Sequence, residues 1–258
     1  MTTDLRNVTC PTPVASQPER IALAHGEGGR LMRRLIQQQI LPVVGNEYLR
    51  LGGDAAILPA CQGPMAMTTD SFVVAPLFFP GGDIGSLAVY GTVNDLAVAG
   101  ATPRWISLSL ILEEGLELAI LERVLTCVAA AAERAGVLVV TGDTKVVPRG
   151  AADKLFINTT GVGEIIGAMP ARPDELMVDD TLIVTGPIGR HGIAVMVARE
   201  QLAFEPTPES DSAPLANAVR ALQMAGVPIR AMRDATRGGV GAVLHEWAEC
   251  SGRSLVVD

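Results

Sequence analysis

The chain has 258 residues, of which 48% are hydrophobic and 19% are charged, and its formal net charge is −8. This composition supplies a large core and excludes an intrinsically disordered chain. The negative charge argues against a nucleic-acid backbone as partner, and an aromatic content of only 3% argues against stacking on single-stranded bases. No segment has the uninterrupted apolar length of a transmembrane helix, so no membrane partner is expected.

Cysteine usage points to a reducing compartment. The four cysteines, Cys10, Cys61, Cys127 and Cys250, are widely spaced and form no C-x-x-C pair. Neither a zinc site nor a disulfide framework is therefore predicted, and the expected location is the cytoplasm. Residues 1–19 lack the apolar region of a signal peptide and are predicted to form a flexible leader.

A glycine-rich loop comes first along the chain. Residues 25–29, His-Gly-Glu-Gly-Gly, precede a helical pattern at residues 30–40. Backbone N–H groups at the start of a helix can hold an anion, which makes Gly26, Gly28 and Gly29 candidate phosphate contacts. A single glycine loop is also typical of a simple turn.

Two acidic residues follow in predicted strands or at their ends. Tyr48 to Leu51 is predicted to be a strand that ends at Gly52-Gly53-Asp54. Met65 to Val74 is predicted to be a second strand, with Asp70 near its middle. Because Asp is unfavourable in strands, this local conflict indicates a functional position. The alternative is an exposed Asp on the polar face of the strand.

Residues 83–99 are predicted to form a helix with an apolar face that includes Ile84 and Ala88. Asp95 falls on the same face, and a buried carboxylate must be paired, bound to a metal or placed at the rim of a cleft. Asp83 stands at the N-terminal end, where a carboxylate offsets the helix dipole, so its expected role is structural.

The most informative stretch is residues 137–145, Val-Leu-Val-Val-Thr-Gly-Asp-Thr-Lys. Its apolar half predicts a short buried strand that ends in a turn at residues 141–143. In open α/β sheets, ligands collect at the carboxyl ends of strands. Asp143 and Lys145 are two residues apart and leave the same side of an extended chain, which suits a phosphate ester and its metal. The alternative is a turn Asp with a surface Lys.

Other elements indicate two domains. Alternating patterns predict strands at Trp105–Leu112 and Lys154–Ile165, and a helical pattern lies between them at residues 118–135. The composition shifts to Pro, Asp and Glu near residue 170. We therefore expect an N-terminal domain at residues 20–170 and a C-terminal α/β domain at residues 171–258.

The expected second domain contains strands at Thr181–Thr185 and Ser254–Val257, with helices between them. Thr236 is predicted to cap the helix that ends near Glu249, and His245 is predicted to lie on the polar face of that helix. Because the chain stops on an incoming strand, the expected second domain is incomplete.

Four acidic residues stand in separate segments of small residues: Asp54, Asp70, Asp95 and Asp143. A divalent metal bound to nucleotide phosphates needs several oxygen ligands from separate segments. Together with Lys145 and the glycine loop, these residues predict a magnesium–nucleotide site. No P-loop or protein-kinase motif occurs, so the site is of another architecture.

Several stretches resemble the HypE family of hydrogenase maturation factors, which belongs to the aminoimidazole-ribonucleotide-synthase-like superfamily. They are residues 24–29 (Ala-His-Gly-Glu-Gly-Gly), 69–71 (Thr-Asp-Ser), 76–82 (Pro-Leu-Phe-Phe-Pro-Gly-Gly), 94–95 (Asn-Asp), 111–115 (Ile-Leu-Glu-Glu-Gly), 141–147 (Thr-Gly-Asp-Thr-Lys-Val-Val), 154–158 (Lys-Leu-Phe-Ile-Asn) and 234–240 (Asp-Ala-Thr-Arg-Gly-Gly-Val). The resemblance runs from about Ile21 to the last residue.

The resemblance implies a two-domain α/β fold with mixed sheets, a homodimer formed through the N-terminal sheets, and an ATP site near that interface. The implied reaction is the ATP-dependent dehydration of a cysteine S-carboxamide to a thiocyanate, which supplies the cyanide ligand of [NiFe]-hydrogenase. The implied partners are the carbamoyltransferase HypF and the HypC–HypD iron-loading complex.

The resemblance also assigns roles to residues. It implies that the four Asp residues hold Mg²⁺ and ATP and that Lys145 lies beside the reacting group. The further implied contacts with ATP are Gly26, Gly28, Gly29, Asn94, Gly142, Thr144, Thr236, Arg237, Gly238 and Gly239.

One departure and two alternatives accompany the resemblance. The family ends in a Pro-Arg-x-Cys-like tail that this sequence does not show, and Cys250, inside a predicted helix, is not matched to that cysteine; this chain is expected to lack full turnover. One alternative is another ATP-using relative, of the selenophosphate synthetase or thiamine-phosphate kinase type. The other is a non-catalytic, nucleotide-binding assembly module.

Overall fold

The computed structural model describes residues 19–257 except residues 167–169 and 171. The predicted leader, apart from Glu19, lies outside the described residues, and so does Cys10. No helix in the described ranges is long and apolar enough to cross a membrane.

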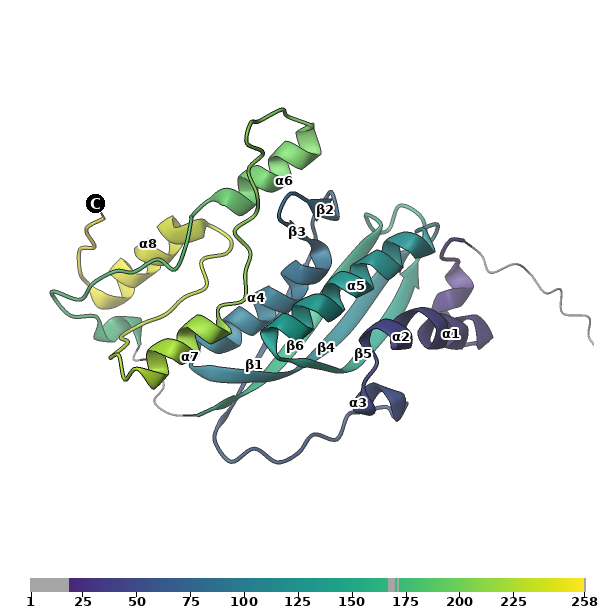
Figure 1. The fold of residues 1–258 in the computed structure, drawn as a ribbon, viewed down its shortest axis with the longest axis horizontal. Coiled ribbons are helices and arrows are strands. Elements are labelled where there is room, and N and C mark those ends of the chain that lie inside the picture. Colours follow the sequence, from purple (N-terminus) through teal and green to yellow (C-terminus); the bar gives the residue numbers. More distant parts are fainter. Residues whose placement is uncertain (1–18, 167–169, 171, 258) are drawn as a thin grey trace, which may run out of the picture.

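A four-stranded mixed sheet forms the centre of the N-terminal half (Figure 1). Its strand order is β1-β6-β4-β5, in which only β4 and β5 run parallel. The strands are β1 (Met65–Phe72), β4 (Ala101–Glu113), β5 (Leu138–Val147) and β6 (Leu155–Ile165). A short hairpin of β2 (Phe78–Phe79) and β3 (Gly82–Asp83) precedes the first long helix. The strands expected around Asp70, Trp105 and Phe156 are confirmed.

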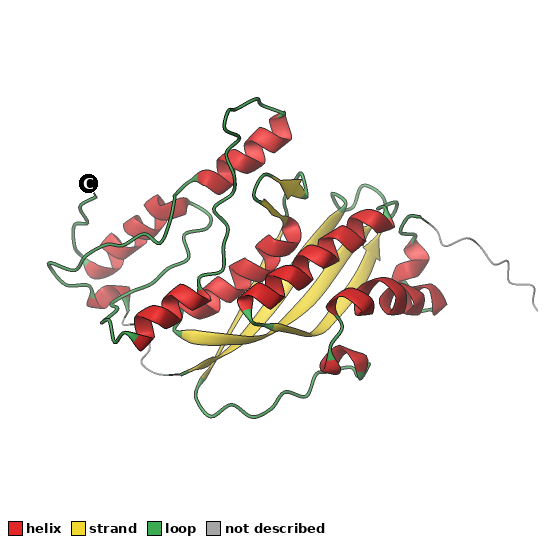
Figure 2. Cartoon of the chain, viewed as in Figure 1, coloured by secondary structure: helices red, strands yellow, loops and turns green. Residues whose placement is uncertain are grey.

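Two long helices, α4 (Ile84–Val98) and α5 (Leu118–Ala135), lie on one face of the sheet (Figure 2). Asp83 caps α4, because its carboxylate accepts the Ser86 N–H at 2.9 Å. The sequence predicted one apolar face for this helix, whereas residues on nearly every side of α4 are buried. The reason is that α4 contacts the sheet, α5 and the later helix α7 (Ala216–Met224).

Helix α4 approaches strand β6 closely because β6 carries glycine at the crossing point. A Cβ added to Gly161 would lie 2.6 Å from the Thr92 Cγ2 atom. The hydroxyl of Thr159 bonds to that of Thr92 and also donates to the Ala88 carbonyl at 3.2 Å. These contacts fix α4 over the sheet and orient the side chains near its C-terminal end.

Short helices flank the outer edge of β5. They are the 3₁₀ turn η2 (Leu23–Gly26), α1 (Arg30–Leu35), the π-helical turn η3 (Ile36–Ile40), α2 (Leu41–Val44) and α3 (Glu47–Arg50). The strand predicted at Tyr48–Leu51 is wrong, since these residues belong to α3 and its end. The cause is Asn46, whose side-chain oxygen accepts the Tyr48 N–H at 3.0 Å and so starts a helix.

Strand β5 also differs from its prediction, because it continues through the expected turn at residues 141–143. Parallel pairing with β4 runs from Trp105↔Leu138 to Glu113↔Val147. Val140 is an extra residue at a β-bulge between the Ile106 and Ser107 pairs. Asp143 therefore lies within the strand and not after it.

The second half contains η4 (Pro173–Glu175), α6 (Arg190–Glu200), α7 and α8 (Gly239–Ser251). The strands predicted at Thr181–Thr185 and Ser254–Val257 are not formed: the structure gives both segments as irregular chain, and residues 181–185 are exposed. A strand needs a hydrogen-bonded neighbour, and no such pairing involves either segment in the described residues.

Candidate functional site

Three carboxylates from three distant segments lie near one another on the helix-covered side of the sheet. Asp70 of β1 faces α4, because a Cβ on Gly91 would lie 3.7 Å from the Asp70 Oδ2 atom. Asp95, near the end of α4, accepts a hydrogen bond from the Thr68 hydroxyl at 2.9 Å. Asp234, which precedes α8, is close enough to interact electrostatically with both.

The environment of Asp234 raises the pKa of its carboxyl group from 3.8 to about 6. Burial is the main cause, and the negative charges of Asp95 and Asp70 add to it, while a hydrogen bond from Asn94 acts in the opposite direction. Such clusters of oxygen donors suit a hard cation. Sequence reasoning missed Asp234 as a site carboxylate, although it opens the Asp-Ala-Thr-Arg-Gly-Gly segment.

Asn94 joins the two halves of the chain beside this cluster. Its Nδ2 group donates to the Ala213 carbonyl at 3.0 Å, and its Oδ1 atom accepts the Leu215 N–H at 2.8 Å. The side chain is buried, with 6% exposed. Because the amide is engaged at both ends, Asn94 holds the segment that follows α6 against α4.

Asp143 and Lys145 lie elsewhere on the sheet. The pairing Asp70↔Thr159↔Leu108↔Gly142 crosses all four strands, so Asp70 and Gly142 are three strand spacings apart. Three spacings amount to about 14 Å. Asp143 and Lys145 are exposed on the face opposite to α4, which is the face of Ser109. One copy of the chain therefore does not bring Asp143 to Asp70.

The alternation of burial along β5 confirms that Asp143 and Lys145 share one side of the strand, since Thr144 and Val146 between and after them are buried. Thr144 was predicted to contact ATP, yet its side chain lies on the helix-covered side. Gly142 packs against the backbone of Leu108, where a Cβ would collide with its carbonyl oxygen.

The glycine loop lies at the edge of β5. A Cβ on Gly26 would lie 2.7 Å from the Val146 nitrogen, so this glycine permits the close approach of η2 to the strand. Gly28 and Gly29 are exposed, and Gly29 is the N-cap residue of α1. The loop thus lies next to the strand that carries Lys145.

The other predicted loop residues occupy exposed positions. Asp54 lies in irregular chain between α3 and β1. Thr236, Arg237 and Gly238 follow Asp234 and are exposed as well, and Gly239 is half-buried. Thr236 is not the cap of α8, because Gly238, at φ +84°, occupies that position and no side chain caps the helix.

No group of three or more His, Cys, Asp or Glu side chains is arranged to hold a metal within the described ranges. Asp70, Asp95 and Asp234 nevertheless supply carboxylate oxygens, which are the type of ligand that magnesium prefers, and a cation would relieve the repulsion between them. The single chain contributes donors to such a site but does not assemble a complete one.

The fold and these acidic segments define a protein of the AIR-synthase-related class. The model of the AIR synthase related N-terminal domain matches residues 52–165, and that of the C-terminal domain matches residues 178–258. The chain is 48% identical over 240 residues to the carbamoyl dehydratase HypE of Rhizobium leguminosarum bv. viciae, which covers 93% of this chain and 69% of the relative. It is 46% identical over 238 residues to that of Escherichia coli K12, which covers 90% and 70%. The chain belongs to the HypE family of carbamoyl dehydratases.

Solved structures agree with this assignment. A HypE in complex with ATP superimposes with a TM-score of 0.85 at 49% identity, over 89% of this chain and 68% of that one. The HypE of a HypE–HypF complex gives a TM-score of 0.71 at 45% identity, over 84% and 70%. A thiamine monophosphate kinase from Aquifex aeolicus gives 0.55 at 23% identity, over 87% and 74%, and shares the fold alone.

Proposed function

We propose that this chain uses ATP to dehydrate a cysteine S-carboxamide to a thiocyanate, the group that provides the cyanide ligand of [NiFe]-hydrogenase. The observation that carries the proposal is that Asp234, from the second half of the chain, lies within electrostatic reach of Asp70 and Asp95 in a member of the HypE family. A HypE that is 49% identical to this chain has been solved in complex with ATP.

The chemistry follows from the poor leaving ability of an amide oxygen. That oxygen attacks the γ-phosphorus of ATP, and ADP leaves with the electrons of the broken P–O bond. The phosphorylated oxygen then departs as phosphate while the nitrogen gives up its protons, which leaves a carbon–nitrogen triple bond on sulfur. The former amide oxygen therefore ends in inorganic phosphate.

Each site residue has a proposed role that follows from its position in the fold. Asp70, Asp95 and Asp234 would hold magnesium, with Asp54 and Asp143 as further predicted ligands. Bound magnesium would neutralise phosphate charge and align the γ-phosphoryl group. The Thr236–Gly239 loop adjoins Asp234, is exposed as far as Gly238 and suits phosphate contacts, as does the Gly26–Gly29 loop beside β5. Lys145, as the exposed cation on β5, would lie near the reacting group.

The proposed domains are residues 20–170, which would bind ATP and metal and form the dimer, and residues 171–258. The sheet face opposite to α4 supports the homodimer, because Met65 and Met67 are exposed there by 56% and 73%. Asp143 and Lys145 lie on the same face, so a second copy would cover them. Light scattering should give twice the monomer mass at micromolar concentration, and a monomer would contradict the proposal.

Two further partners are proposed on the family relationship. HypF would supply the carbamoyl group, and a HypE–HypF complex is among the structures similar to this chain. The HypC–HypD complex would accept the cyanide. ATP binding needs neither partner, so it can be tested on the chain alone, whereas phosphoryl transfer to the carboxamide oxygen needs HypF.

The test is ATP binding and hydrolysis with and without magnesium, measured by calorimetry and phosphate release. We expect magnesium-dependent binding that the Asp234→Asn variant loses while its circular dichroism stays unchanged. Tight binding with no ATP hydrolysis, even when a peptide with an S-carbamoylated cysteine is supplied, would instead favour a nucleotide-binding assembly module. Absence of binding would overturn the proposal.

A further inference from the structure

The loop that carries Asp54 is held almost entirely at its two ends. At its start, the Gly52 N–H donates to the Leu49 carbonyl at 3.3 Å, and at its end Ile165 donates to the Pro64 carbonyl at 2.9 Å. Between them, residues 53–61 make no hydrogen bond to any part of the chain that the structure describes. Ile57, near the middle of the loop, is 88% exposed. The contacts at the ends therefore decide where Asp54 lies.

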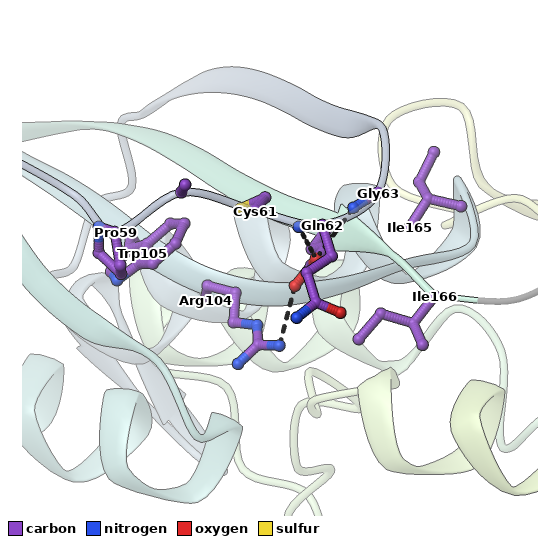
Figure 3. A pocket seen from close by; sticks show the side chains of 10 residues that line it. Pro59, Cys61, Gln62, Gly63, Arg104, Trp105, Ile165 and Ile166 are labelled. Carbon is purple, nitrogen blue, oxygen red and sulfur yellow. Dashed lines mark hydrogen bonds and ion pairs between the residues drawn. The ribbon is translucent and has the colours of Figure 1, made fainter.

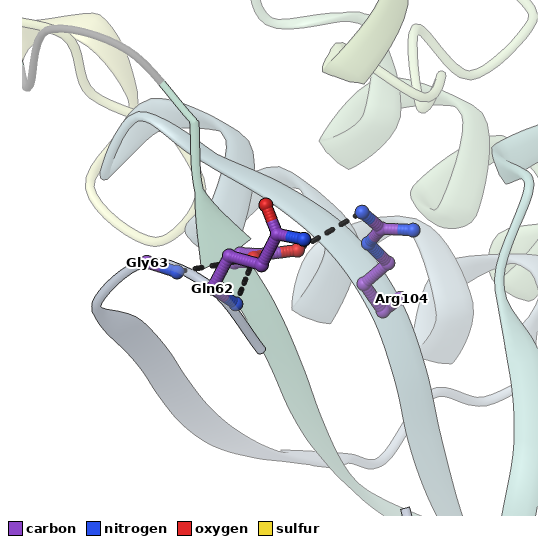
Figure 4. A network of polar contacts seen from close by, with 4 residues as sticks. Gln62, Gly63 and Arg104 are labelled. Carbon is purple, nitrogen blue, oxygen red and sulfur yellow. Dashed lines mark hydrogen bonds and ion pairs between the residues drawn. The ribbon is translucent and has the colours of Figure 1, made fainter. Parts of the chain in front are cut away.

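The C-terminal end of this loop is fastened by one side chain (Figure 4). The Glu164 Oε1 atom accepts the N–H groups of Gln62 at 2.7 Å and Gly63 at 3.2 Å. The Oε2 atom of Glu164 pairs with Arg104 at 2.9 Å. Both carboxylate oxygens are thus engaged, and the two N–H groups, followed by Arg104, hold the pKa of Glu164 below its usual range.

Beside this attachment the loop lines an open cavity of about 540 Å³, so it is not packed down along its length (Figure 3). Arg104 and Trp105 of β4 and Ile165 of β6 line the cavity on the sheet side, and Cys61 lines it on the loop side. At Gly63 the loop comes close to β6, where a Cβ would collide with the Ile165 carbonyl oxygen. The hydrogen bonds of Glu164 therefore hold this part of the loop to β6, where side-chain packing does not.

We propose that Glu164 is a positioning residue that sets the Asp54 loop for magnesium–ATP binding. It would touch neither nucleotide nor metal and would act through the backbone of Gln62 and Gly63. The inference rests on the proposed function, since it assigns Asp54 to the metal–nucleotide site. Loss of the carboxylate would free Gln62 and Gly63 and weaken binding without altering the reacting groups.

The test compares Glu164→Gln with Glu117→Gln, a matched control. Glu117 also pairs with an arginine, Arg20, at 2.6 Å, but accepts no hydrogen bond from a loop backbone. Glu164→Gln should raise the magnesium–ATP concentration for half-saturation about tenfold with the maximal rate unchanged, and Glu117→Gln should not. Hydrogen exchange at Gln62 and Gly63 should become faster in Glu164→Gln alone. Arg104→Gln, which leaves both backbone contacts, should have the smaller effect of the two loop variants.

Three results would overturn the inference. One is unchanged half-saturation in Glu164→Gln, and another is unchanged exchange at Gln62 and Gly63. The third is an equal fall in affinity and maximal rate together with faster exchange throughout the sheet, which would mark a general loss of stability. If the unmodified chain binds no magnesium–ATP, the proposed function fails as well, whereas normal binding in both the unmodified chain and Glu164→Gln refutes this inference alone.

Discussion

Asn94 on α4 donates its side-chain N–H to the carbonyl of Ala213 at 3.0 Å, which joins residues 119 positions apart in the sequence. The next residue along the helix, Asp95, belongs to the carboxylate cluster, so one turn of α4 both holds the second half of the chain and presents a site residue. Substitution of Asn94 should therefore lower both the stability of the protein and its affinity for nucleotide.

We expect Asn94→Ala to lower the free energy of unfolding by about 1–3 kcal/mol, because it leaves the Leu215 N–H and the Ala213 carbonyl without their partner. Urea unfolding measures the loss, and calorimetry should show weaker magnesium–ATP binding. Gln223→Ala is the control, since Gln223 also crosses between the halves, to the Gly100 carbonyl at 3.2 Å, but makes no hydrogen bond to Asp70, Asp95 or Asp234 in the described residues. Equal effects of both variants on ATP binding would contradict the special role of Asn94.

The contact between α4 and β6 predicts an asymmetric response to alanine. Gly161→Ala should destabilise the protein by about 1–3 kcal/mol, because the new methyl group would lie 2.6 Å from Thr92 and 2.9 Å from Leu96. Gly192→Ala in α6 meets nothing within 4 Å and should instead stabilise its helix by up to about 1 kcal/mol. Thermal unfolding of the two variants shows whether each substitution raises or lowers stability, and a Gly161→Ala protein as stable as the unmodified chain would refute close packing of α4 on β6.

Docking of α6 should weaken at acidic pH. Burial lowers the pKa of His191 from its ordinary value of 6.5, with the Asp211 charge acting in the opposite direction. The ring receives an edge contact from Phe79 and a hydrogen bond between its Nδ1 atom and Ser210. The folded state disfavours the charged His191 ring. The stabilisation that the neutral ring gives to the folded state is therefore complete above pH 6.5 and is lost as the pH falls toward the lower folded-state pKa.

The measurement is urea unfolding at about pH 7.5 and about pH 5.5. His191→Gln should reduce the difference between the two free energies of unfolding. His245→Gln serves as control, because His245 is exposed on α8 and, among the described residues, pairs only with Glu249 at 3.4 Å. A pH dependence that persists in His191→Gln would show that another group causes it.

Substitution of the predicted metal ligands should separate binding from folding. Asp95→Asn and Asp143→Asn should abolish magnesium-dependent ATP binding while the protein stays folded. Asp83→Asn should retain binding and cost under about 1 kcal/mol, since asparagine also caps helices well. Calorimetry with wild-type affinity in Asp95→Asn and Asp143→Asn would remove both residues from the site.

Cys250 should not accept a carbamoyl group. It lies in the last turn of α8, and the helix places it about 17 Å along its axis from Gly239, the end near Asp234. The thiol is exposed but cannot travel to the carboxylates without unfolding the helix. After incubation with HypF, carbamoyl phosphate and ATP, mass spectrometry should find no carbamoyl or cyano adduct on Cys250, and such an adduct would make it the acceptor.

Local sequence patterns predicted the central sheet well because its strands alternate and its helices have distinct ends. Asp83 is the N-cap of α4, and Gly136 is the C-cap of α5, so the residue type at each of these helix ends is itself a local signal. The pattern failed at Tyr48, where the decisive interaction is the hydrogen bond that the Tyr48 backbone N–H donates to the Asn46 side-chain oxygen. It also failed at Thr141–Asp143, because pairing with a neighbouring strand extends β5 through residues that are typical of a turn.

The candidate site was less accessible to sequence reasoning, since separate acidic segments do not reveal which of them meet. Asp70 and Asp95 are near each other because β1 packs under α4. Asp234 joins them only through the path of the chain after α7. The opposite orientation of Asp143 depends on the faces of paired strands, and a bulge at Val140 precedes it. These relationships arise from tertiary structure, and no local pattern encodes them.

The absence of hydrogen bonds along residues 53–61 also bears on how this protein can vary during evolution. Doubling the length of a flexible loop costs only about 0.6 kcal/mol of closure entropy, so insertions there would scarcely disturb folding. Selection on this segment would then act through nucleotide use and hardly at all through stability. Variants of the loop could consequently accumulate in a folded, abundant protein, which makes this segment a route by which the activity can change while the architecture is conserved.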